Sequence, residues 1–167
     1  MTDAIAFSVP GKPVVWQRAG GNFGKDGHGI RRFTPHKVRA AEKAIATIAK
    51  AVMAGAPPLS CPLRLMMVFV YEMPASWPRR TREAGASGTI YHTGTPDIDN
   101  LSKLVQDALN RVAYQDDSQI AELIVRKRYG SPARTDITIS PLTSAGVTPA
   151  DKRRAGPETV DIAPRLL

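Results

Sequence analysis

The chain has 167 residues, with 23 Lys and Arg against 15 Asp and Glu, which gives a formal net charge of +8 and an isoelectric point near 10.0. This length fits one domain with a buried core, and the charge favours a polyanionic partner, most simply a nucleic acid. Cys61 is the single cysteine, which excludes an internal disulfide and a cysteine-based zinc site. The sequence begins without a basic, apolar leader and contains no membrane-length apolar run, so we expect a cytoplasmic protein with no membrane partner.

The N-terminal half is predicted to form a strand, a loop, a long helix and a second strand. Residues 4–9 are a short apolar run that ends at a proline and a glycine, whereas residues 14–30 are rich in glycine and basic side chains, as in a mobile loop. Residues 35–54 follow Thr34 as a predicted N-cap, begin with Pro35 and repeat apolar side chains at helical spacing. Residues 63–72 are apolar on both faces, which favours a central strand.

The C-terminal half is predicted to add one helix and two strands. Residues 74–96 are predicted to form one long loop, and a loop of this length in a small domain is usually functional or disordered. A second helix starts near Asp99 and carries its apolar side chains on one face. Residues 121–129 and 135–140 are predicted strands, joined by a hairpin turn at 130–133.

These elements predict an α/β (α+β) fold with the order β-α-β-α-β-β. The expected architecture has two layers, a mixed β-sheet with two main helices on one face. The domain is predicted to span residues 1–142. The composition of residues 143–167 shifts to small and polar side chains, so this tail is predicted to be disordered.

Four aspartates flank the second helix, Asp97 and Asp99 before it and Asp116 and Asp117 after it. Two carboxylates about 4 Å apart repel by roughly 4 kcal/mol at an effective dielectric of about 20, and a divalent cation removes that cost. Hard oxygen ligands suit Mg²⁺, with Mn²⁺ as a substitute. A helix cap is the alternative role for either of the first two acids, although a cap does not need both. The cluster predicts a metal site in a basic protein, as in an enzyme that acts on a polyanion.

Asp117 must lie beside Asp99 if one chain is to complete this site. A helix that ran to Val112 would carry the chain about 20 Å away, too far for the remaining residues to return. A helix that ends near Asn110 leaves a longer return, and Asn tolerates the left-handed conformation of a helix end. Two alternatives remain: the helix stops near Asn110, which we favour, or Asp117 completes the site of a partner subunit.

Lys103 lies one helical turn from Asp99 on the same face. It is either one partner of an i, i+4 ion pair worth under about 0.5 kcal/mol, or a cation that stabilises charge in a transition state. Asp107, one turn further on, is predicted to be a salt-bridge or structural residue.

The acidic motifs resemble those of a known enzyme family. Residues 96–103 (PDIDNLSK), 107–110 (DALN) and 116–120 (DDSQI) are similar to the spaced motifs of the RusA family of Holliday-junction resolvases. N-terminal motifs from Gly11-Lys12-Pro13 to Phe33-Thr34-Pro35 also look like those of phage-type members, so the resemblance covers about residues 4 to 140. Arg111 departs from the pattern, because the family often has a glycine there.

The resemblance implies a homodimeric, Mg²⁺-dependent endodeoxyribonuclease that nicks two opposed strands of a four-way DNA junction during recombination and repair, in a bacterial or phage-infected cell and with no small-molecule cofactor. It places the metal-binding acids on Asp97, Asp99 and Asp117, with Asp116 beside them, and the essential lysine on Lys103. The basic side chains that we expect to hold the junction through its phosphates are Arg18, Arg31, Arg32, Arg79, Arg80, Arg82, Arg126, Lys127 and Arg128.

Two other functions stay open. A non-catalytic basic module for structured DNA or RNA would keep the charge without needing four acids, and a general metal nuclease would cut flaps or branched DNA without preferring junctions. The dimer interface also has two alternatives. These are the alternating face of residues 63–71 and the apolar side chains Leu123, Val125, Ile137 and Ile139.

Overall fold

The computed structural model describes residues 4–17, 20–23, 30–33 and 35–142. Its elements are β1 (Ile5–Pro10), β2 (Gly20–Phe23), β3 (Ile30–Phe33), α1 (His36–Met53), β4 (Leu63–Tyr71), α2 (Arg79–Ser87), α3 (Ile98–Leu109), a 3₁₀ turn (Asp117–Gln119), β5 (Ile120–Tyr129) and β6 (Arg134–Pro141). The strands predicted over 4–9, 63–72, 121–129 and 135–140 and the helix predicted over 35–54 are confirmed to within one residue at each end.

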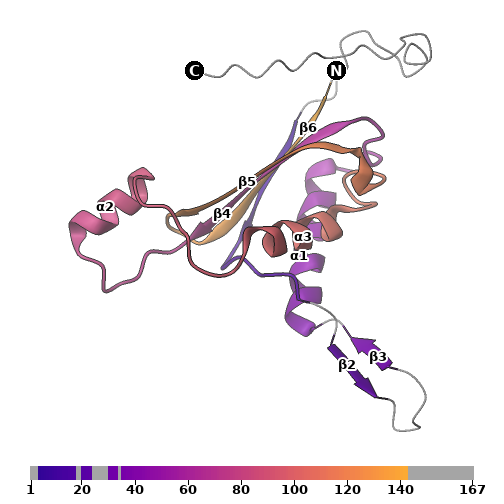
Figure 1. The fold of residues 1–167 in the computed structure, drawn as a ribbon. Helices are drawn as coiled ribbons and strands as arrows, with labels where there is room; N and C mark the ends of the chain where they lie inside the picture. Colours follow the sequence, from indigo (N-terminus) through magenta and orange to yellow (C-terminus); the bar gives the residue numbers. More distant parts are fainter. Residues whose placement is uncertain (1–3, 18–19, 24–29, 34, 143–167) are drawn as a thin grey trace, which may run out of the picture.

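A four-stranded mixed sheet forms one layer of the fold. Its strand order is β1-β6-β4-β5, in which β4 runs parallel to β5 and antiparallel to β6, and β6 runs antiparallel to β1. The helices α1 and α3 cover one face of this sheet (Figure 1). The two-layer α+β architecture with a mixed sheet and two main helices is therefore confirmed.

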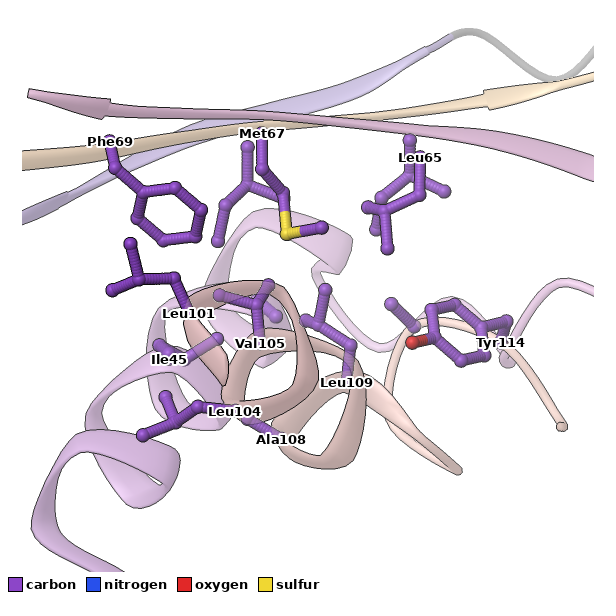
Figure 2. Close-up of a cluster of buried hydrophobic side chains, with 14 of the residues drawn as sticks. Ile45, Leu65, Met67, Phe69, Leu101, Leu104, Val105, Ala108, Leu109 and Tyr114 are labelled. Carbon is purple, nitrogen blue, oxygen red and sulfur yellow. The ribbon is translucent and has the colours of Figure 1, made fainter. Parts of the chain in front are cut away.

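The core lies between the central strand β4 and the apolar face of α3. Leu65, Met67 and Phe69 alternate along β4 and point toward Leu101 and Val105 of α3 (Figure 2). Each of these side chains is buried, and burying one of them fully contributes about 1.5–3 kcal/mol. This contact fixes the position of α3, and thereby of both its ends, relative to the sheet.

The prediction of one basic loop over 14–30 is wrong. The structure pairs β2 with β3 in an antiparallel two-stranded sheet, with Gly20 opposite Phe33 and Phe23 opposite Ile30. Glycine has a low strand propensity, and its frequency here hides the strand pattern in the sequence. Arg18, residues 24–29 and the predicted disordered tail of 143–167 lie outside the described residues.

The prediction of an unbroken loop over 74–96 is also wrong, because this segment contains α2. The helix starts after Pro78 and ends at Gly88, whose φ of 82° is the left-handed conformation of a helix end. Gly85 is its buried residue. A short helix that buries so little has no apolar period, so only its terminal proline and glycine could have revealed it.

The predicted hairpin at 130–133 is wrong as well, because β5 and β6 do not pair with each other. Both strands pair with β4, which lies between them. The four-residue link crosses the end of β4, where the Gly130 amide donates to the Tyr71 carbonyl at 2.9 Å. A Cβ at Gly130 would lie 2.7 Å from Val70 Cγ1, so this crossing requires glycine.

The helix α3 ends where the sequence predicts, but a different residue takes the left-handed conformation. Leu109 is the last helical residue and Asn110 is its C-cap, with an ordinary φ of −59°. Arg111 has a φ of 60° instead. This is the position at which the resembling family often has glycine, and any L-residue with a Cβ is strained there.

We predict that Arg111→Gly raises the free energy of unfolding by about 1 kcal/mol, because glycine relieves most of the left-handed strain at that position. For a chain of this length the change corresponds to a melting temperature about 2–4 °C higher. Thermal and urea unfolding of the two proteins would measure it. Arg111→Ala keeps the Cβ and should give no such gain; equal stabilisation by both variants would contradict the explanation.

Candidate active site

Two exposed carboxylates lie at the N-terminus of α3. Asp97 is the N-cap residue, with extended backbone angles, and Asp99 lies in the first helical turn. Within the described part of the chain the Asp97 side chain makes no capping hydrogen bond. The capping alternative therefore does not account for this acid, and both carboxylates are available to a ligand at the end of the helix that favours negative charge.

Lys127 holds the chain immediately before this acid pair. Its amine donates to the carbonyl of Gly94 at 2.7 Å and to that of Pro96 at 2.9 Å. A side chain predicted to contact DNA thus makes two hydrogen bonds inside the protein. These bonds fix the backbone that leads into Asp97 and place a cation beside it.

Lys103 extends from the exposed side of α3. Its Nζ lies 3.9 Å from Asp107 Oδ1 and 5.2 Å from the centre of the Trp16 ring. The backbone amide of Trp16 donates to the carbonyl of Asn100 at 3.0 Å, which holds Trp16 beside α3. The salt-bridge role predicted for Asp107 is confirmed, and an exposed pair of this kind contributes at most about 1 kcal/mol. Sequence reasoning missed Trp16, although it lies within the N-terminal stretch that resembles the family.

In the second acidic motif, Asp116 and Gln119 make hydrogen bonds within the turn, and both acids, Asp116 and Asp117, are exposed. The Ser118 amide donates to Asp116 Oδ1 at 3.0 Å, and the Asp116 amide donates to Gln119 Oε1 at 2.8 Å, which forms a capping box. The hydrogen bond from Ser118 lowers the pKa of the Asp116 carboxyl. Asp117 lies beside Asp116 and is exposed. The cap gives Asp116 a structural role that the metal prediction did not include.

Gln119 also fixes this turn to the segment before β4. Its amide nitrogen donates to the carbonyls of Leu59 and Cys61, at 3.0 Å each. Leu59 in turn donates to Ala113 O at 2.9 Å and accepts from the Gln115 amide at 3.1 Å. The chain between α3 and β5 is therefore held at the end of the sheet where β4 begins.

These contacts separate Asp117 from the first acid pair. The twelve residues of α3 span about 18 Å. From Ile120 to Lys127, β5 spans about 23 Å, with Asp117 just before its start and Asp97 near the far end. Within the described ranges, no three or more His, Cys, Asp or Glu side chains form a group that could hold a metal ion.

The preferred alternative, that a helix ending near Asn110 lets Asp117 return to Asp99, is thus not what the structure shows. The helix does end there, but the residues that follow do not run back along it. Tyr114 is fully buried and donates from its hydroxyl to Gln106 O at 3.0 Å, so this stretch packs into the core beside the C-terminal half of α3.

The predicted phosphate-binding residues that the structure describes belong to three separate elements. Arg79, Arg80 and Arg82 are exposed on α2, which extends from the end of the sheet where α3 begins (Figure 1), and Arg79 pairs with Glu83 at 2.8 Å. Arg31 and Arg32 belong to β3. On β5, the side chains of Arg126 and Arg128 alternate with that of Lys127, so they occupy the sheet face opposite the helices.

An aromatic cluster attaches the α2 segment to the sheet. His92 stacks on Tyr71 with ring centroids 4.2 Å apart and lies 4.9 Å from Tyr129, which is 4.8 Å from Trp77. Burial and the nearby charge of Lys127 lower the pKa of His92, and burial raises the pKa of Tyr71 to about 12. Both side chains are therefore neutral near pH 7.

The chain is basic, and it presents two exposed carboxylates at a helix N-terminus, with Lys103 on the same helix and Lys127 bound to the preceding backbone. These are features of an enzyme that acts on a polyanion. The family model described as Endodeoxyribonuclease RusA matches residues 10–140. The chain therefore belongs to the RusA family of endodeoxyribonucleases, as its motifs predict. It is also 33% identical over 145 residues to the uncharacterized protein YqaN of Bacillus subtilis (strain 168), across 82% of this chain and 96% of that protein. No helix in the described ranges is long and apolar enough to cross a membrane.

We predict effects of very different size on stability for two residues in the second acidic motif. Gln119→Ala should lower the free energy of unfolding by about 2 kcal/mol, because it removes three hydrogen bonds worth roughly 1 kcal/mol each or less. Asp117→Asn should change it by less than about 0.5 kcal/mol, as expected for an exposed side chain. Urea unfolding measures both values. A large loss of stability with Asp117→Asn would give that acid a structural role.

Proposed function

We propose that this chain is a Mg²⁺-dependent, structure-specific endonuclease that resolves four-way DNA junctions by paired nicks, as a cytoplasmic homodimer. Membership of the RusA family supports deoxyribonuclease activity. The observation that carries the proposal is the exposed, uncapped acid pair at the start of α3, in a chain with a net charge of +8. Among the described residues the Asp97 side chain does not cap the helix, so the acid pair is free to bind a divalent ion.

The donor set of one chain fits only part of a metal site. Asp97 and Asp99 offer hard carboxylate oxygens at one end of α3, which suits Mg²⁺ or Mn²⁺. Asp117 lies at the other end of that helix, so we propose that it joins the acid pair of a partner subunit. This is the second of the two alternatives that the sequence left open, and the separation along α3 and β5 supports it.

When bound, a divalent ion would polarise the scissile phosphate and lower the pKa of a water. The protein's own groups have separate tasks. Lys103 presents a cation one turn from Asp99, where it can stabilise the charge that develops on the phosphate. The two hydrogen bonds of Lys127 keep the backbone before Asp97 in one position, so that the acid pair needs little rearrangement when substrate binds.

The exposed arginines of α2 are suited to hold a junction arm through its phosphates. Arg80 and Arg82 lie on the same short helix as Arg79, at the end of the sheet that carries the acid pair. Contacts to phosphates position a duplex without reading its sequence, which is what a structure-specific nuclease requires. Arg31 and Arg32 of β3 are proposed to add further phosphate contacts.

A labelled four-way junction tests the proposal directly. Incubation with Mg²⁺ should give paired, symmetric nicks, and EDTA should abolish them. Linear duplex and flap substrates serve as controls. Equal cutting of flaps would support the general branched-DNA nuclease, and tight junction binding with no cutting in Mg²⁺ or Mn²⁺ would support the non-catalytic module.

We predict that Asp97→Asn, Asp99→Asn and Asp117→Asn each abolish nicking and keep junction binding, because the phosphate contacts are made elsewhere. Mixing two inactive variants then tests the shared site. A heterodimer of Asp99→Asn and Asp117→Asn subunits retains one site with all its acids, so the mixture should regain nicking of one strand.

A mixture of Asp97→Asn and Asp99→Asn is the matched control. In that heterodimer each acid pair carries one substitution, so nicking should not return. If the Asp99→Asn and Asp117→Asn mixture also stays inactive while subunits exchange, Asp117 does not act across the dimer.

We predict that Lys103→Ala lowers the nicking rate by about 10²-fold or more at matched metal and salt, as for loss of a group that stabilises transition-state charge. Its melting temperature should stay close to that of the wild type, because its ion pair is exposed. Lys43→Ala, on the exposed side of α1, is the control for lost charge. Equal nicking rates for Lys103→Ala and wild type would make Lys103 a surface residue.

A further inference from the structure

β5 is an edge strand, and most of its outer side is open. It pairs with β4 on one side only. On the other side, the described part of the chain reaches it at a single bridge, between Tyr91 and Arg128. Backbone groups from about residue 120 to 127 therefore face outward, and an unpaired edge of this length can add another strand.

Exposed apolar side chains gather along the same edge. Leu123 is 46% exposed on β5, Ile98 is 41% exposed at the start of α3, and Tyr91 is 76% exposed beside Arg128. The two latter residues line a cleft with Val125 and Lys127 of β5. These three are most of the large apolar side chains that are exposed among the described residues, where Val52 on α1 is the other. Such a concentration is typical of an interaction surface.

The sequence of this open stretch is complementary to itself. In an antiparallel pairing of two β5 strands centred on Ile124, Leu123 lies opposite Val125 of the partner subunit, and Glu122 lies opposite Arg126 of the partner subunit. The two-fold axis repeats each pair, so the interface gains two apolar pairs and two ion pairs around a central Ile124 contact. Glu122 already pairs with Arg64 on the neighbouring strand of its own sheet, so the charges would form a ladder across the sheet.

We propose that a second copy of this chain pairs with the β5 edge in this register, giving a continuous eight-stranded sheet with all its main helices on one side. The occupant is a second copy because the edge matches its own reverse in both charge and apolar character. The sequence left two candidate interfaces open, and the proposed pairing uses Leu123 and Val125 of the second one. It excludes Ile137 and Ile139, which are buried in the core at 1% and 0% exposure.

The opposite edge of the sheet is less suited to pairing. β1 has six residues and ends in Pro10, which lacks a backbone donor. Its alternate side chains are polar or small, and one of them, Ser8, donates to Asp136 at 2.6 Å within the chain. β1 therefore offers a shorter edge, and it has no charged side chains that could form ion pairs across a two-fold axis.

This pairing also explains the divided acid site, a step that rests on the proposed function. Antiparallel strands place the start of one β5 toward the end of the other. Asp117 precedes the start, and Lys127 near the end binds the carbonyls on either side of residue 95 in the segment before Asp97. The interface thus directs Asp117 of each subunit toward the acid pair of its partner.

Cysteine cross-linking tests both the interface and its register, without DNA or metal. Facing residues of an antiparallel pair have Cα atoms about 4.5–5.5 Å apart, within the range of a disulfide. Ile124→Cys should therefore give a covalent dimer under mild oxidation. Leu123→Cys is the matched control, because its two copies would lie about 8 Å apart. Wild type, which contains only Cys61, should give no covalent dimer.

A charge exchange tests the same register in the unoxidised protein. Arg126→Glu places two acids opposite each other at two points and should weaken the dimer about tenfold or more, as measured by light scattering over a dilution series. The double variant Glu122→Arg with Arg126→Glu restores opposite charges across the axis and should recover most of the affinity. Arg39→Glu on α1 makes the same charge change elsewhere and should have no effect.

Several outcomes would overturn the proposal. These are a monomeric wild type, linkage through position 123 in place of 124, or a dimer that neither cysteine links and the charge exchange does not alter. Failure of the proposed function is distinguishable: a protein that links at position 124 but cuts no junction loses only the nuclease proposal. One that cuts junctions without linking there loses only the interface.

Discussion

The parallel pairing of β4 with β5 is the constraint on which the rest of this structure depends. Two strands that run in the same direction cannot be joined by a tight turn, so the connection must travel back along the sheet before β5 can begin. Here α3 makes that return journey, packed on β4 by Leu101 and Val105. A helix in this role necessarily starts at one end of the sheet and finishes at the other. The acids before and after it are separated for the same reason that the sheet can form at all.

The acidic motifs therefore contain two kinds of residue that the sequence does not distinguish. Asp116 and Gln119 satisfy backbone groups of the turn and join it to Leu59, so they belong to the fold. Asp97 and Asp99 stand at the surface with no such task. The acidic motifs are specific because they combine two requirements. Some of their residues fix the turn before β5, and others are available for chemistry.

Much of the fold could be predicted because its main elements carry a clear period. Alternation from Leu63 to Tyr71 and helical spacing along α3 reflect burial on one face, and both predictions were confirmed. The elements that the sequence did not predict have a weak apolar pattern. Gly85 is the one buried residue of α2, and two of the four residues of β2 are glycines. The local sequence pattern could not predict which strands pair. A four-residue link between β5 and β6 has the same sequence features whether or not β4 lies between the two strands. The candidate acids and Lys103 could be recognised as a motif in the sequence. The distance between Asp117 and the acid pair could not be predicted, because it follows from the parallel pairing of β4 with β5.

The two hydrogen bonds of Lys127 have a mechanical consequence. The chain leaves α2 at Gly88, meets β5 at the bridge between Tyr91 and Arg128, and is clamped again at Gly94 and Pro96 before it enters α3. If α2 holds a duplex as proposed, a force on α2 is transmitted to the sheet at the bridge and at the Lys127 hydrogen bonds before it reaches Asp97. In the proposed function, Asp97 and Asp99 would therefore keep their positions relative to the sheet while α2 bears the load of the bound DNA.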